Sequence, residues 1–145
     1  MAQTRMIDFL NKVEAFYGRL GTYYKELSDD SKSRDVKTIL SHLSRHEENV
    51  RCMIQRYEEG ADQVVLNTWF KVSPDFTQLK MPEDLVFSSE KSVDDIIQLA
   101  IDIDESLIDM YKLLIRESLD DEVKDVLNNL IQEEVVEKIK LMNIR

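Results

Sequence analysis

The chain has 145 residues, a formal net charge of −10 and a sequence pI of about 4.7. Such acidity argues against nucleic-acid binding, because phosphate recognition requires a basic face. The chain has three glycines and two prolines. This favours a mainly helical chain, since β-rich domains need more turn residues. The length predicts one domain that spans residues 1–145.

The cysteine content and the N-terminus bear on the cellular compartment in which we expect the protein. Cys52 is the one cysteine, so it forms no intramolecular disulfide, and we expect a half-buried packing residue. The N-terminus has no signal-peptide pattern, and no apolar run nears the roughly 18 residues of a membrane-spanning helix. We therefore expect a cytoplasmic protein with no membrane partner.

The first two helices are predicted over residues 4–27 and 34–59. In each of them apolar residues recur at alternating spacings of three and four, as in a helix with one face in a core. Ser33 is the predicted N-cap of the second helix, and Gly60 is its predicted C-cap. The connection between them is short, so the two helices should be antiparallel neighbours.

Residues 61–91 are predicted to form a long crossover. This stretch contains both prolines, the one tryptophan and three of the five phenylalanines, namely Trp69, Phe70, Phe76 and Phe87. It is long enough to run from one end of a bundle to the other, which would make the second and third helices parallel. Its apolar residues should pack on the bundle or on a second subunit. Because exposed aromatic residues often mark interfaces, they predict a homodimer.

The last two helices are predicted over residues 93–117 and 120–142, and they repeat the first two. Ser92 is the predicted N-cap of the third helix. At a constant offset of 87 residues and without a gap, identical residues recur in pairs that include Tyr24/Tyr111, Leu27/Leu114, Ser31/Ser118, Val36/Val123, Leu40/Leu127, Leu43/Leu130 and Glu47/Glu134. The repeat indicates two copies of one helical hairpin, related by approximate two-fold symmetry.

Polar residues interrupt the apolar face of each predicted helix near its midpoint. They are Tyr17, His46, Glu47, Asp104, Glu134 and Glu137. Because the midpoints of similar helices meet at one level in a bundle, these side chains can converge in the core. Several buried carboxylates need a cation, protons or basic partners to compensate them. Carboxylates with an imidazole suit iron, manganese or zinc. The open alternative is that each carboxylate sits at the edge of its apolar face and reaches solvent.

Three other residues near these positions have simpler interpretations. Tyr24 and Tyr111 are expected to be core tyrosines. His42 lies on a more polar face of its helix and is predicted to be at the surface, whereas His46 is a possible ligand.

The duplicated hairpin, the crossover and the mid-helix carboxylates together resemble the ferritin-like superfamily, and most closely its rubrerythrin-type branch. The segments that carry the resemblance are FYGRLGTYYKEL (16–27), LSRHEENVR (43–51), AIDIDESLIDMYKLL (100–114) and LIQEEVVEKI (130–139). That family binds two irons through one Glu on the first and third helices and a Glu-x-x-His pair on the second and fourth. The resemblance therefore implies an all-α, ferritin-like four-helix bundle of two repeated antiparallel pairs.

The ligand set that the resemblance implies is incomplete in this chain. Glu47 and Glu134 match the family's pattern, and Asp104 stands at the place of the third-helix Glu. Tyr17 replaces the first-helix Glu, and the two expected histidines are replaced by Val50 and Glu137. The possible metal ligands are therefore Glu47, Asp104, Glu134 and Glu137, with Tyr17 and His46 nearby.

Three functions remain open from the sequence. The favoured one is a bundle with a degenerate di-metal centre and no catalysis, which acts as an oligomeric interaction or regulatory protein with no metal or weakly bound iron or manganese. The second is a di-iron or manganese oxidase, peroxidase or ferroxidase that uses the carboxylate set. The third is a four-helix bundle unrelated to metals, with solvated carboxylates.

Overall fold

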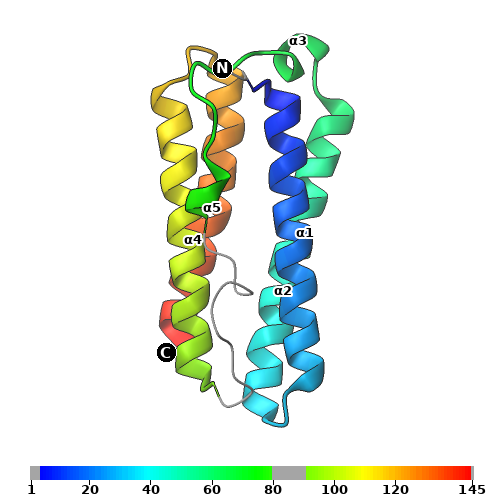
Figure 1. Ribbon diagram of the computed structural model, residues 1–145, viewed down its shortest axis with the longest axis vertical. Helices are drawn as coiled ribbons and strands as arrows, with labels where there is room; N and C mark the ends of the chain where they lie inside the picture. The colour runs from blue at the N-terminus through cyan, green and yellow to red at the C-terminus, as the bar shows by residue number, and fades with distance from the viewer. Residues whose placement is uncertain (1–3, 80–90, 145) are drawn as a thin grey trace.

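The computed structural model describes residues 4–79 and 91–144. The bundle is made of α1 (Met6–Asp30), α2 (Arg34–Gly60), α4 (Val93–Arg116) and α5 (Asp121–Ile144). Two short helices, α3 (Gln63–Leu66) and the 3-10 helix η1 (Phe76–Gln78), lie in the crossover. Figure 1 shows that α1 is antiparallel to α2 and α4 to α5, while α2 and α4 run in the same direction. The predicted all-α bundle of two antiparallel pairs is confirmed.

The helix ends differ from the predicted ones by up to three residues. α1 continues to Asp30 rather than ending at residue 27, and the N–H of Ser31 then donates to the carbonyl oxygen of Ser28 over 3.3 Å. α4 ends one residue earlier than predicted, and α5 covers 121–144 in place of 120–142. Apolar periodicity locates helix ends poorly, because the terminal turns carry few core residues.

The two-fold repeat extends to the hydrogen bonds that begin the second helix of each pair. The side-chain oxygen of Ser33 accepts from the N–H of Val36 over 3.3 Å. At the same offset of 87 residues, Asp120 Oδ1 accepts from the N–H of Val123 over 3.0 Å. Each bond satisfies a backbone donor that the first turn of a helix leaves free. The hairpins therefore share their N-caps as well as their apolar residues.

Gly21 lies where α1 and α2 approach closely. The hydroxyl of Ser44 on α2 donates to the carbonyl oxygen of Gly21 over 2.8 Å. A Cβ at Gly21 would lie 3.5 Å from the Cβ of Glu47. The contact between the two helices thus places the backbone of Glu47 against α1, with its side chain in the core.

The first part of the crossover is attached to the start of α1. The N–H of Met6 donates to the Thr68 carbonyl over 2.8 Å, and the N–H of Phe70 donates to the Thr4 carbonyl over 2.9 Å. The ring of Phe70 packs edge-on against Phe9, with centroids 5.5 Å apart. The crossover therefore covers the end of the bundle where α1 begins.

These contacts correct the prediction that the aromatic residues of the crossover are exposed. Phe70 is buried in the core and Phe76 is half-buried, whereas Trp69 is 55% exposed. Phe87 lies outside the described residues.

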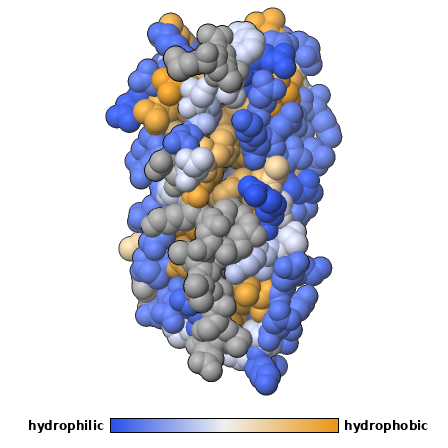
Figure 2. Space-filling model, in the orientation of Figure 1, coloured by the Kyte–Doolittle hydropathy of each residue, from blue (hydrophilic) through white to orange (hydrophobic). Residues whose placement is uncertain are grey.

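Figure 2 shows one face of the bundle, with hydrophilic residues along its outer edges and apolar residues along its middle, between the two helix pairs. No helix in the described part of the chain has the length and apolarity needed to cross a membrane.

Candidate metal centre

Four carboxylates from three helices are buried in the core of the bundle. The side chains belong to Glu47 on α2, Asp104 on α4, and Glu134 and Glu137 on α5. All four residues are at most 3% exposed. They share the core because each stands among the apolar residues of its own helix. The alternative in which these carboxylates reach solvent at the edge of an apolar face is therefore wrong.

Tyr17 links α1 to this group. Its hydroxyl donates to Glu134 Oε1 over 2.9 Å and lies 2.8 Å from the hydroxyl of Tyr111. Tyr17, Tyr24 and Tyr111 are at most 1% exposed, so the expectation of core tyrosines is confirmed for Tyr24 and Tyr111. The hydrogen bond from Tyr17 partly compensates the burial of the Glu134 carboxylate.

His46 enters the centre from α2. Its Nε2 lies 3.5 Å from Glu134 Oε1, and its Nδ1 lies 3.5 Å from Glu137 Oε2. The side chain is 11% exposed. A carboxylate beside one ring nitrogen orients an imidazole and favours a proton on that nitrogen. The His46 ring therefore lies between two carboxylates, with Glu134 beside Nε2 and Glu137 beside Nδ1.

His42 lies closer to the centre than the sequence predicts. Its side chain is 40% exposed, but its Nε2 is 2.8 Å from Glu137 Oε1. His42 and His46 are one helical turn apart on α2, so both project toward α5. The polar pattern of α2 hides this contact, since an imidazole at the edge of the helix can reach across to a neighbouring helix. The sequence signal that could have indicated this contact is the spacing of four residues between His42 and His46, which places both on the same side of α2.

The centre contains buried ligand atoms without hydrogen-bond partners among the described residues. They are His46 Nε2, Glu47 Oε2, Asp104 Oδ2 and Glu134 Oε2. One ligand atom each from His46, Glu47 and Glu134 lies within 4.8 Å of the others. Unpartnered buried polar atoms are costly, by roughly 1–3 kcal/mol each. A cation between these atoms would compensate them, and carboxylates with one imidazole fit iron, manganese or zinc.

Burial and mutual repulsion change the protonation of the centre. Burial, followed by the charges of Glu134 and Glu137, raises the pKa of Glu47 well above its ordinary value. Burial, with Glu134 and Glu47 nearby, raises the pKa of Asp104 in the same way. For His46, burial lowers the pKa, but the carboxylates of Glu134 and Glu137 outweigh it and leave the pKa raised. Without a cation the centre therefore retains protons.

The two halves of the repeat contribute unequally to this centre. Asp104 on α4 corresponds by the repeat to Tyr17 on α1, and Glu137 on α5 corresponds to Val50 on α2. Val50 is 1% exposed and offers no ligand atom. The half built by α4 and α5 thus carries three carboxylates. Among the described residues, the half built by α1 and α2 offers Glu47 and His46 as candidate ligands.

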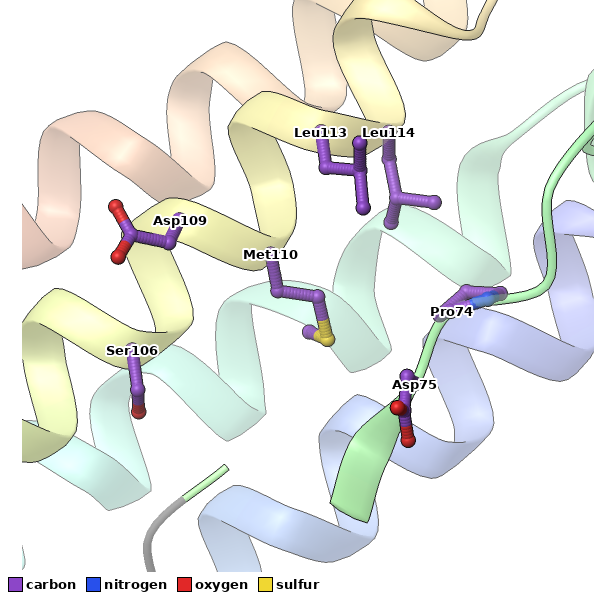
Figure 3. A pocket seen from close by; sticks show the side chains of 7 residues that line it. All are labelled: Pro74, Asp75, Ser106, Asp109, Met110, Leu113 and Leu114. Atoms are coloured by element: carbon purple, nitrogen blue, oxygen red, sulfur yellow. The ribbon is translucent and has the colours of Figure 1, made fainter. Parts of the chain in front are cut away.

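A pocket between η1 and α4 is separate from these carboxylates. It has a volume of about 310 Å³, and its described lining residues are Pro74, Asp75, Ser106, Asp109, Met110, Leu113 and Leu114. Figure 3 shows Met110 and Leu114 projecting from α4 toward the crossover at Pro74. None of these lining residues belongs to the buried centre. The pocket adds no ligand to it.

Comparison with known proteins identifies the fold. No protein-family model matches the sequence, and no curated protein matches it significantly. The structure is similar to the crystal structure of a candidate ferritin-like diiron-carboxylate protein from Thermotoga maritima. The TM-score is 0.72 with 12% sequence identity, over 99% of this chain and 96% of that one. The chain therefore has the ferritin-like four-helix fold.

Proposed function

We propose that this protein binds one iron or manganese ion in the core of its bundle and serves as a metal-stabilised interaction or regulatory protein rather than an oxidase. The observation that carries the proposal is the set of unpartnered buried atoms on His46, Glu47, Asp104 and Glu134. Their burial without partners would be costly, and one cation offsets several of them at once. We also propose a rubrerythrin-type origin, because Glu47 and Glu134 match the ligand pattern of that family.

The ion would be held by His46 Nε2 and by the carboxylates of Glu47 and Glu134, whose ligand atoms already lie within 4.8 Å of one another. Asp104 would join them, because its buried Oδ2 also has no hydrogen-bond partner among the described residues and Glu134 is near enough to raise its pKa. The bound ion would supply positive charge that relieves the repulsion among the carboxylates. Glu137 would orient His46 from behind. Binding would therefore stabilise the folded chain, since the unfolded chain has no such site.

The alternative is a di-metal oxidase, peroxidase or ferroxidase that uses the same carboxylates. A second ion would need ligands from α1 and α2, where Val50 is aliphatic and Tyr17 is already hydrogen-bonded to Glu134 and Tyr111. A di-iron bundle uses a Glu and a histidine at these places. The asymmetry of the centre therefore favours one ion over two.

Metal titration of chelator-treated protein tests the proposal. Calorimetry with Mn²⁺ and anaerobic Fe²⁺ should give about one equivalent per chain, and the melting temperature should rise with metal concentration. Glu134→Gln should abolish binding, whereas Glu133→Gln, which changes an exposed neighbour, should retain it. Two equivalents with consumption of oxygen or peroxide would support the oxidase instead. Absence of binding by all metals tried would refute both.

A further inference from the structure

His42 connects the buried centre with the surface of the bundle. Its side chain is 40% exposed, while the Glu137 side chain that it contacts is 3% exposed. The distance between His42 Nε2 and Glu137 Oε1 is 2.8 Å. One contact therefore spans the boundary between solvent and core. Neither His42 nor this contact is needed to hold the ion in the proposed function.

A surface pocket lies on the outer side of His42. It has a volume of about 570 Å³ and is lined by Asp35, Thr38, Ile39, His42, Val93 and Ile144. These residues come from the beginnings of α2 and α4 and from the end of α5. Asp35 and Thr38 are exposed. The pocket thus opens to solvent and has an imidazole on its wall and a carboxylate among its lining residues.

Side chains with candidate ligand atoms form a series from this pocket to the centre. The ligand atoms of successive side chains in the series are at most 3.5 Å apart. His42 Nε2 contacts Glu137 Oε1, and Glu137 Oε2 lies 3.5 Å from His46 Nδ1. His46 Nε2 lies 3.5 Å from Glu134 Oε1, and Glu134 Oε2 is unpartnered. A dehydrating cation needs a replacement ligand at each step into a core, because an unsolvated charge there is very costly. These side chains supply such a series.

We propose that divalent cations reach the buried centre through this pocket, with His42 and Glu137 as transfer ligands that pass the ion to His46 and Glu134. This inference rests on the proposed function, because it requires a cation in the core. The net charge of −10 favours the approach of cations to the surface in general. His42 adds a defined place at which a cation exchanges water for a protein ligand. A transfer ligand lowers the barrier in both directions and leaves the final affinity nearly unchanged.

Stopped-flow loading of the metal-free full chain with Co²⁺ tests this route, because coordinated cobalt has visible absorbance. His42→Gln keeps a polar side chain of similar length but offers a poor ligand. Thr38→Trp fills the mouth of the pocket without replacing His42. Both variants should slow loading and release by about tenfold or more, as for one ligand's share of a barrier. Their equilibrium dissociation constants from calorimetry should stay near the wild-type value.

Thr22→Trp is the matched control, because Thr22 is exposed on α1 in a depression lined by Ala15, Gly18, Arg19, Tyr23 and Glu26, away from His42. It should load at the wild-type rate. Wild-type loading rates in both His42→Gln and Thr38→Trp would overturn the route while leaving the proposed function intact. Weaker equilibrium binding by His42→Gln with an unchanged loading rate would make His42 a resident ligand and also overturn the route. A wild-type chain that binds no cobalt, manganese or iron would refute the proposed function and this inference together.

Discussion

The hydroxyl oxygens of Tyr17 and Tyr111 lie 2.8 Å apart in the core, although the residues are separated by 94 positions in the chain. Tyr17 also donates to Glu134. By the repeat, Tyr17 occupies the position that Asp104 holds in the other hairpin. A phenol at this place gives a hydrogen bond to a buried carboxylate, where an acidic residue would add another charge. In the half of the centre built by α1 and α2, Tyr17 thus provides a hydrogen-bond donor where the other half has a carboxylate.

Removing the Tyr17 hydroxyl should destabilise the protein. In Tyr17→Phe, Glu134 Oε1 and the hydroxyl of Tyr111 each lose a partner in the core, so we expect a loss of about 1–3 kcal/mol. Tyr57→Phe is the matched control, because the buried hydroxyl of Tyr57 has no hydrogen-bond partner among the described residues. Urea unfolding of the metal-free proteins measures both changes. Equal stabilities of the two variants would contradict the role given to Tyr17.

The metal-free protein should be more stable at pH 5 than at pH 8. The pKa values of Glu47 and Asp104 are raised above their ordinary values of 4.5 and 3.8, chiefly by burial. A raised folded-state pKa gives stability that is fully present below the unfolded pKa and is lost as pH rises through the folded one. The raised pKa of His46 acts in the same direction. Melting temperatures measured with chelator present test this.

Glu47→Gln is the control for that pH dependence. The substitution removes one buried carboxyl group, so the fall in melting temperature between pH 5 and pH 8 should be smaller than in the wild type. Asp8 and Asp95 have lowered pKa values and act in the opposite direction, but both carboxyl groups are exposed and titrate at lower pH. A melting temperature that rises from pH 5 to pH 8 in the wild type would contradict the expected sign.

Restoring ligands in the half of the centre built by α1 and α2 should create a second metal position. Tyr17→Glu and Val50→His together would give that half a carboxylate and an imidazole on the same core-facing sides. By analogy with di-iron bundles, metal content should then rise from about one to about two equivalents per chain. Elemental analysis after gel filtration measures this. A folded double variant with unchanged metal content would show that the repeat register does not define the ligand places.

Dimerisation through the crossover stays a prediction, now narrowed to Trp69. Its side chain is 55% exposed and lies under the Arg5 guanidinium, 5.7 Å from the ring centroid. We expect multi-angle light scattering to give twice the chain mass of 17.0 kDa, and Trp69→Ala to weaken the dimer. Phe70→Ala would instead disturb the core, so it is not a test of the interface. A wild-type monomer at micromolar concentration would remove the prediction.

The ferritin-like bundle was predictable from the sequence because its evidence is local and repeated. Apolar residues at alternating spacings of three and four define each helix, and identical residues at an offset of 87 define two equal hairpins. The crossover is long enough to run from one end of the bundle to the other, which led to the prediction that α2 and α4 are parallel. The four carboxylates could be proposed as a group because each interrupts the same kind of apolar face at a similar depth.

The tertiary structure alone decided which side chains meet those carboxylates. His42 lies on a polar face of α2, yet it contacts Glu137 on α5. His46 was expected near the carboxylates, but its place between Glu134 and Glu137 came only from the structure. Phe70 is buried because the crossover turns back onto the start of α1 and packs against Phe9. Such contacts depend on the rotation of each helix and the path of a connection, which are set by the packing of the whole bundle. Periodicity along one helix carries no information about them.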